Sequence, residues 1–209
     1  MDHSRGAGSR RVRSAAIALP LFFSVNVSEA SNPSYSLDRG EVEISGETSL
    51  FPYSARSVRF EGCIQPQDGN FYQGDIRMAM SSFVFSVPFA SDVIQSEAQF
   101  DTLRYPNVSL RLQHLRPVPG RSRVNGLLEI RGERLPVEIR VDVMSIKSGI
   151  VVDGALNLRQ SDFGVTPFQW GLLRVADEIE IHFEAAFTET TKTLFPAIGT
   201  ANAGLSCLP

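Results

Sequence analysis

The sequence predicts a mainly β protein: a single antiparallel barrel of about eight strands, with one helical segment near residues 91–103. After residue 35, apolar and polar residues alternate with a period close to two, which is the period of a strand with one dry face. Gly, Pro, Asn and Asp gather between these stretches, and some of the gaps are short enough for hairpins. Closing such a series of hairpins into a barrel removes exposed strand edges.

The most regular alternation occurs in three stretches, at residues 108–113, 135–143 and 178–185. In the last two, charged residues such as Glu138 and Glu180 take every second position, as on a solvated face. The apolar residues between them therefore share the inner face. Those expected to face inward are Val108, Leu110, Leu112, Val137, Ile139, Val141, Val143, Ile179, Ile181, Phe183 and Ala185.

Weaker patterns complete the expected barrel. Further strands are expected at residues 35–38, 41–45, 57–64, 75–80, 123–130 and 150–158, with turns at 67–70, 117–120, 131–133 and 148–149. Residues 89–103 break the two-residue period, and a helix or helical loop is expected there. Ser91-Asp92 is a plausible start, and Tyr105-Pro106 ends it, because a residue before proline disfavours the α region.

The first thirty residues predict a cleaved signal peptide. Arginines precede an apolar run at residues 15–25, which is shorter than the roughly 20 residues that span a bilayer. Ser28 and Ala30 have the small-residue spacing of a signal-peptidase site, so we expect cleavage after Ala30 and a periplasmic mature protein. The alternatives are a buried first helix or a membrane anchor, and Pro20 counts against a packed helix. The pair Arg10-Arg11 leaves twin-arginine export open beside the favoured general secretory route.

Three segments are therefore expected. They are a signal peptide at residues 1–30, one barrel domain at 31–187 and a C-terminal tail at 188–209. No linker rich in Pro, Gly or Ser and no internal repeat divides the chain further.

Export makes the two cysteines informative, because the compartment is oxidising. Cys63 and Cys207 both lie in the mature chain, and an even count permits one disulfide between them. Such a bond closes a long loop and would contribute on the order of 4 kcal/mol. The alternative is two unpaired thiols that never meet. Neither cysteine has a second Cys or a nearby His at a metal-ligand spacing, so no metal site is predicted.

Composition and motifs favour a binding protein over an enzyme. The net charge of −3 is too small to suggest a nucleic-acid partner, and a hydrophobic content of 43% is enough for a real core. No Gly-x-Ser-x-Gly elbow is present, and no Cys–His pair is placed for nucleophilic catalysis. His114 and His182 fall on strand faces that are expected to be exposed. We therefore expect no catalytic residues and no cofactor.

Five local patterns occur in an order that is typical of one family. They are Tyr35-Ser36-Leu37-Asp38, the segment from Ser96 to Tyr105-Pro106, Val124–Gly132 followed by Pro136-Val137, Leu158–Val165, and Val175–Ile179. With them the chain resembles the YceI-like family of periplasmic, lipid-binding proteins. The resemblance implies a lipocalin-like barrel with an elongated apolar cavity that holds an isoprenoid chain or another long amphiphile. The chain departs from the family pattern at residues 39–41 and 87–92, near where a ligand head group would sit.

The predicted function is that of a periplasmic binding or carrier protein for a long-chain amphiphile, such as an isoprenoid lipid or a fatty-acid derivative. The residues expected to line the ligand are Val108, Leu110, Leu112, Leu128, Ile130, Val137, Ile139, Val141, Ile181 and Phe183. No transmembrane segment is expected in the mature chain, and a homodimer is permitted. Two alternatives stay open: these side chains merely pack one another, or a ligand-free barrel serves as an envelope interaction or stress-response module.

Overall fold

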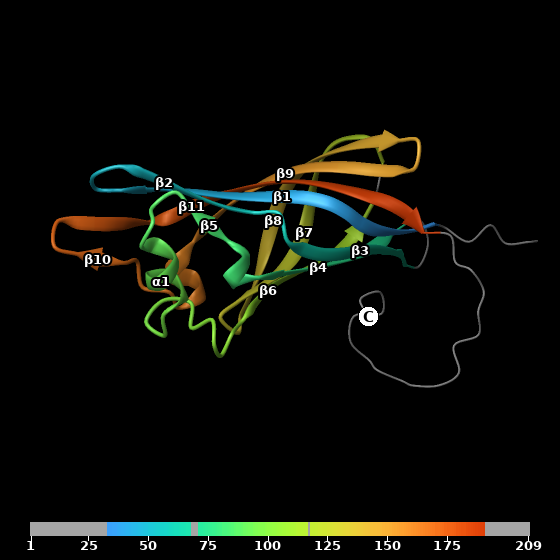
Figure 1. Cartoon of the computed structure of the whole chain (residues 1–209). Helices are drawn as coiled ribbons and strands as arrows, with labels where there is room; N and C mark the ends of the chain where they lie inside the picture. Colours follow the sequence, from blue (N-terminus) through green and yellow to red (C-terminus); the bar gives the residue numbers. More distant parts are fainter. Residues whose placement is uncertain (1–32, 68–70, 117, 191–209) are drawn as a thin grey trace, which may run out of the picture. The chain divides into compact units, whose positions relative to one another are not determined.

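The computed structural model describes residues 33–67, 71–116 and 118–190, which form an eight-stranded antiparallel barrel with short elements around it (Figure 1). The barrel strands are β1 (Ser34–Thr48), β3 (Phe60–Pro66), β4 (Tyr72–Ala79), β6 (Asn107–Leu115), β7 (Gly120–Ile130), β8 (Glu133–Ile146), β9 (Gly149–Arg159) and β11 (Leu173–Thr190). The short elements are β2 (Pro52–Ser57), β5 (Val84–Phe85), β10 (Gln169–Trp170), the helix α1 (Ala90–Gln95) and the 3₁₀ turns η1 (Met80–Ser82) and η2 (Gln160–Phe163).

The barrel closes where its first strand pairs with its last. β1 and β11 run antiparallel from the pair Ser34 and Thr190 to the pair Thr48 and Val175. The remaining barrel strands follow in the order β9, β8, β7, β6, β4 and β3 between them. The predicted closed antiparallel barrel of mainly β structure is thereby confirmed.

The two-residue alternation sorts side chains to the two faces of the barrel wall. In β8, Ile139 and Val141 are buried, whereas Glu138 and Arg140, which alternate with them, are exposed. Cross-strand ion pairs decorate the outer face, for example Arg123 Nη1 to Glu138 Oε1 at 2.8 Å. Such exposed pairs contribute little to stability, so inward apolar packing holds the barrel together.

The strand predicted at residues 57–64 is interrupted, and this part of the prediction is wrong. Ser57 ends β2 and Phe60 begins β3, although β1 pairs with both in one register. Ser57 is buried, and its hydroxyl shares a hydrogen bond with that of Ser82 in η1 (2.7 Å). The Arg59 amide also donates to Ser57 Oγ (3.2 Å). With these bonds the chain leaves the pairing with β1 between Ser57 and Phe60. β2 before this bend and β3 after it are therefore separate strands.

The helix predicted to reach residue 103 is shorter in the structure, because α1 ends at Gln95. Ser96 is extended, and its hydroxyl donates to the carbonyl of Val93 (2.6 Å). Serine competes in this way with the helical hydrogen bonds of the backbone. Asp101 then adopts a left-handed conformation with φ 46°, so residues 96–104 form turns instead of further helix.

Several predictions concern residues outside the described part of the chain. The signal peptide at residues 1–30 lies wholly outside it, and so does most of the predicted tail, although β11 extends to Thr190. Within the described residues, no helix is long and apolar enough to cross a membrane.

The disulfide between Cys63 and Cys207 stays a prediction, because Cys207 lies outside the described residues. Cys63 is buried in β3. We expect the denatured, exported protein to resist thiol alkylation until a reductant is added. Mass spectrometry of alkylated peptides measures this, and labelling of both cysteines without reductant would rule the bond out.

Candidate functional site

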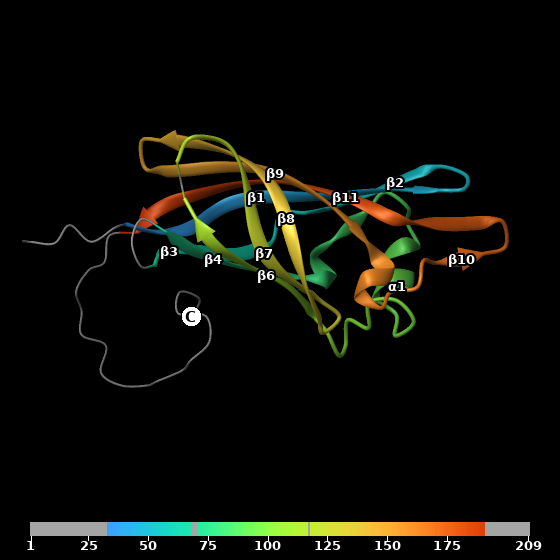
Figure 2. The ribbon, with the colours of Figure 1, turned by 180° about the vertical axis from the view of Figure 1, so that it is seen from behind.

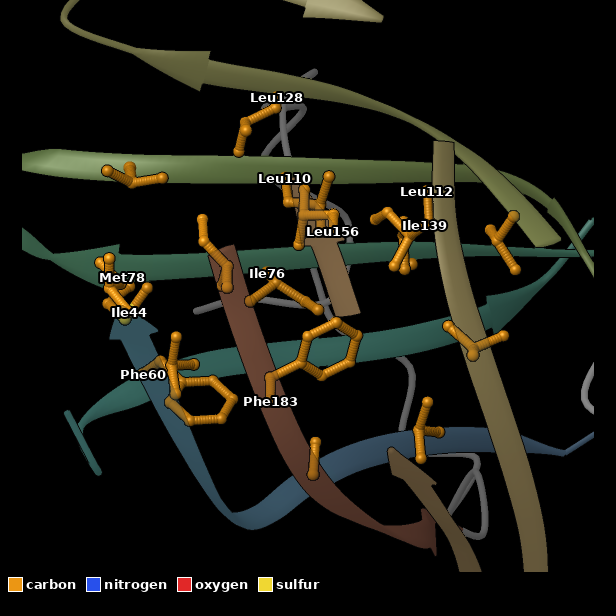
Figure 3. Close-up of a pocket in the computed structure, with 18 of the residues that line it drawn as sticks. Ile44, Phe60, Ile76, Met78, Leu110, Leu112, Leu128, Ile139, Leu156 and Phe183 are labelled. Atoms are coloured by element: carbon orange, nitrogen blue, oxygen red, sulfur yellow. The ribbon is translucent and has the colours of Figure 1, made fainter. Parts of the chain in front are cut away.

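The barrel encloses an apolar cavity of about 180 Å³, and all eight barrel strands contribute side chains to its wall. Figure 3 shows Leu110, Ile139 and Phe183 pointing into this space from three different strands. A cavity of about 150 Å³ lined by Leu, Ile and Phe stays dry and takes up apolar molecules. The interior is therefore suited to hydrocarbon.

Nine of the ten predicted lining residues border the cavity. They are Val108, Leu110, Leu112, Leu128, Ile130, Ile139, Val141, Ile181 and Phe183. Val137 does not border it: the side chain is half-buried and packs against the core. Strand alternation identifies inward residues, but an inward residue can pack on neighbours without reaching the open space. Contact of these side chains with a ligand stays a prediction.

Other parts of the wall were missed by the sequence reading. β4 contributes Ile76 and Met78, which alternate as regularly as the predicted residues do and were recognisable by that signal. Ile94 of α1 and Phe100 of the following turns also line the cavity. Both fall on one side of the helical pattern predicted for residues 89–103, but that pattern does not show that this side closes against the barrel.

Polar groups lie at the two ends of the cavity. Strand pairing places Arg116, just after β6, and Ser122, near the start of β7, at the end where β1 begins and β11 finishes. The Arg116 guanidinium lies 4.6 Å from the centre of the Phe71 ring. Arg116 is the one charged residue in the cavity wall, as far as the structure describes the chain. This end could hold an acidic head group, whereas the middle of the cavity could not.

The opposite end of the cavity carries Tyr53 and Gln160, which are polar but uncharged. Burial raises the pKa of the Tyr53 phenol, so this group is neutral at physiological pH. Gln160 is buried, and its Nε2 donates to the carbonyl of Ala176 (2.9 Å). With this bond formed, the polar side chain is accommodated in an apolar wall.

A second hollow, of about 60 Å³, adjoins this end and is called the vestibule here. Its walls come from the β1–β2 turn, the β5–α1 segment and the β10–β11 hairpin. Four residues line both hollows: Tyr53, Phe85, Ile94 and Gln160. The vestibule therefore extends the apolar lining from the cavity toward the surface.

The sequence matches the family model described as "YceI-like domain" over residues 35–187. This chain belongs to the YceI-like family. The predicted resemblance is thus confirmed, and it covers nearly the whole described barrel. No curated protein is similar enough in sequence to match it.

Solved structures share the YceI-like fold at low sequence identity. Burkholderia cenocepacia BcnA is 22% identical, with a TM-score of 0.61 over 70% of this chain and 95% of that one. A polyisoprenoid-binding domain from Saccharophagus degradans is 12% identical, with a TM-score of 0.62 over 76% and 100%. The Campylobacter jejuni YceI protein is 13% identical, with a TM-score of 0.51 over 64% and 82%. Identities this low establish the fold alone.

The two histidines in the described part of this YceI-like barrel are both exposed. His182 is exposed on β11 and lies 3.0 Å from Glu180 through Nε2 and Oε1. His114 is also exposed and packs edge-on against Phe71, with ring centres 5.6 Å apart. No group of three potential metal ligands occurs among the described residues.

The carboxylate of Asp177 holds the turn η2 at the end of the YceI-like barrel where Gln160 lies. Asp177 of β11 accepts hydrogen bonds from the Ser161 hydroxyl and, at 2.8 Å, from the Ser161 amide. The Ser161 hydroxyl is the main reason that the pKa of Asp177 is lowered, although burial opposes this shift. These bonds hold η2, and with it Gln160, against the barrel wall.

We expect Asp177→Asn to lower the free energy of unfolding by about 1–2 kcal/mol at pH 7, because the charged acceptor is lost. A lowered folded-state pKa stabilises the protein above the unfolded value, and that stability is lost as the pH falls through the folded value. The loss therefore begins near the ordinary pKa of 3.8 and continues below it. Urea unfolding should show a wild-type advantage that is larger at pH 7 than at pH 3.

Asp162→Asn is the matched control for this prediction. Asp162 is exposed in the same turn, and the described structure gives its side chain no hydrogen bond. We expect this variant to unfold like the wild type at both pH values. Equal behaviour of the two variants would contradict the role assigned to Asp177.

Proposed function

We propose that this protein binds a long-chain amphiphile, such as an isoprenoid lipid or a fatty-acid derivative, with the chain inside the barrel. The observation that carries the proposal is the cavity wall, which is apolar along the barrel and polar only near its ends. A hydrocarbon chain loses nothing by leaving water for such a wall, whereas a charged or strongly hydrated ligand would lose its solvation.

The energetics of chain burial favour a ligand with many methylene groups. Each buried methylene contributes about 0.8 kcal/mol, so about ten of them contribute about 8 kcal/mol before the costs of binding are subtracted. This gross contribution equals the binding free energy of a micromolar complex, and further methylene groups can offset the costs of binding without any charged contact. The head group then needs only a few polar partners at an end of the cavity.

The comparisons support this proposal. The chain belongs to the YceI-like family, and one solved neighbour of the same fold is described as a polyisoprenoid-binding domain. The expected signal peptide supports a periplasmic site of action. We accordingly propose a non-enzymatic carrier or sequestering protein of the envelope.

Displacement of the fluorescent fatty acid cis-parinaric acid tests the proposal. Competitors are saturated fatty acids of increasing chain length and the matching primary alcohols. We expect affinity to rise about fourfold per methylene until the cavity is full, and then to level off. The absence of displaceable probe binding, or affinity that ignores chain length, would contradict lipid binding and favour a ligand-free barrel.

The same two series of competitors test the role of Arg116. A guanidinium at the cavity end forms strong hydrogen bonds with a carboxylate and weaker ones with an alcohol. We expect acids to bind more tightly than alcohols of equal length, and Arg116→Ala to remove that difference while the dependence on chain length remains. An unchanged preference in the variant would place the head group elsewhere.

A further inference from the structure

The vestibule end of the barrel carries large apolar side chains on two hairpin tips. Leu50 is 64% exposed and Phe51 41% exposed in the β1–β2 turn. Trp170 at the end of β10 is 72% exposed, and Leu172 in the β10–β11 turn is 85% exposed. Both views of the ribbon show these two hairpins extending beyond the barrel at the end that holds α1 (Figures 1 and 2). We call these four residues the apolar ledge.

Hydrogen bonds join the two hairpin tips. The Ser49 amide donates to the carbonyl of Arg174 (2.8 Å), and the Ser49 hydroxyl donates to the carbonyl of Leu172 (2.7 Å). The Arg174 amide in turn donates to Ser49 Oγ (3.1 Å). Gly171 has φ 58°, a conformation that glycine adopts readily and that turns the tip tightly. The exposed side chains are therefore held together as one surface.

Three segments at this end contain no charged residue, although Glu47, Asp92 and Arg174 lie directly beside them. The three segments are residues 48–55, 78–91 and 163–173. Arg131 in the β7–β8 turn also lies at this end, where it donates to the carbonyls of Gly164 and Glu97, so the uncharged surface is confined to the hairpin tips and the segments beside them. Moving the ledge into an apolar medium would therefore strip water from few polar side chains and from no ionised group within these segments.

The ledge is continuous with the ligand cavity. Phe51 belongs to the ledge and also lines the vestibule, together with Phe168 and Leu173 beside the second tip. Tyr53 and Ile94 then line both the vestibule and the main cavity. Mostly apolar side chains therefore extend from the exposed tips, along the vestibule, to the residues that it shares with the cavity.

We propose that the apolar ledge docks on the surface of a lipid bilayer, and that the ligand chain passes between bilayer and cavity through the vestibule. Passage of the ligand chain rests on the proposed function, whereas docking on the bilayer does not. Indole and leucine side chains suit the boundary between head groups and acyl chains. Four exposed side chains are few for a protein interface, which uses about 20–30 residues a side, but they suffice to enter a bilayer surface.

The protein carries its own reporter for this test, because Trp170 is the one tryptophan of the sequence and stands on the ledge. The intact mature chain is mixed with vesicles of phosphatidylethanolamine and phosphatidylglycerol. We expect co-flotation with the vesicles, a blue shift of the tryptophan emission and quenching by brominated acyl chains. Trp170 does not line the cavity, so these signals report docking and not ligand uptake.

A matched pair of double variants localises the contact. Leu50→Ser with Leu172→Ser removes two ledge side chains and should weaken vesicle binding about tenfold or more. Val118→Ser with Met144→Ser is the control, since these residues are 63% and 53% exposed at the opposite end of the barrel. We expect the control variant to float with the vesicles like the wild type. We expect both double variants to bind cis-parinaric acid in solution with the affinity of the wild type.

Two results would overturn the docking proposal. One is that the wild type does not float with the vesicles, which is expected if the ledge binds a protein instead. The other is equal flotation of the two double variants. Either result is compatible with normal chain binding in solution. Failure of the docking proposal is therefore distinguishable from failure of the proposed function, which the displacement assay tests without vesicles.

Discussion

Leu128→Asp is expected to lower the affinity for cis-parinaric acid by at least about a hundredfold, whereas Leu127→Asp is expected to leave it unchanged. Leu128 is 5% exposed, lines the cavity and pairs with Leu110 on one side and Leu135 on the other. A carboxylate at this position can draw water into the empty cavity, and a bound hydrocarbon chain would exclude that water. Desolvating it under a hydrocarbon chain costs at least about 3 kcal/mol, which corresponds to about two orders of magnitude in affinity.

The control differs by one position along β7. Leu127 is 37% exposed on the outer face, so an aspartate there stays in water. Circular dichroism and thermal unfolding establish that each variant is folded. Leu128→Asn supplies a second, uncharged test, for which we expect a smaller loss of affinity than for the aspartate. Equal probe binding by folded Leu127→Asp and Leu128→Asp would remove Leu128 from the ligand wall.

Phe187→Ala is expected to lower the free energy of unfolding by about 4 kcal/mol, within the range for deleting a buried ring. Phe187 is 2% exposed on β11 and belongs to the core. β11 pairs there with Leu37 of β1 and Ile150 of β9, so the ring packs where the barrel closes. Its loss removes apolar contacts from both neighbouring strands at once and leaves an enlarged cavity.

Urea unfolding at pH 7 measures this effect, with Thr188→Ala as the control. Thr188 follows Phe187 in the same strand but is exposed, and we expect a change within about 0.5 kcal/mol. A loss below about 1 kcal/mol in Phe187→Ala would mean that the ring is not part of the closing core.

Much of the barrel wall was predictable, because strand alternation is a local signal. The inward residues Ile139 and Val141 and the outward residues Glu138 and Arg140 are placed by β8 as the sequence pattern predicts. The same pattern predicted most of the cavity wall. The pattern did not separate Val137, which packs into the core, from the residues that border the cavity, because residues of both groups face inward.

Some of the remaining features depend on contacts between residues far apart in the sequence, and others on local competition or on the shortness of an element. The bend at Ser57 requires the distant hydroxyl of Ser82, and the early end of α1 reflects local competition by Ser96. The two-residue strand β10 is too short to show any period. The vestibule and the ledge arise only when closure of the barrel brings Ser49 against Arg174. Local sequence patterns carry no information on such long-range contacts.

The central claim is that the apolar cavity holds the chain of an amphiphile. Native mass spectrometry of the protein, exported in a bacterial host and purified from the periplasm without detergent, tests it most directly. We predict one bound adduct per chain, released by organic solvent and identified as a long-chain lipid. A homogeneous ligand-free mass, together with no uptake of added long-chain fatty acid or isoprenoid alcohol, would contradict the claim.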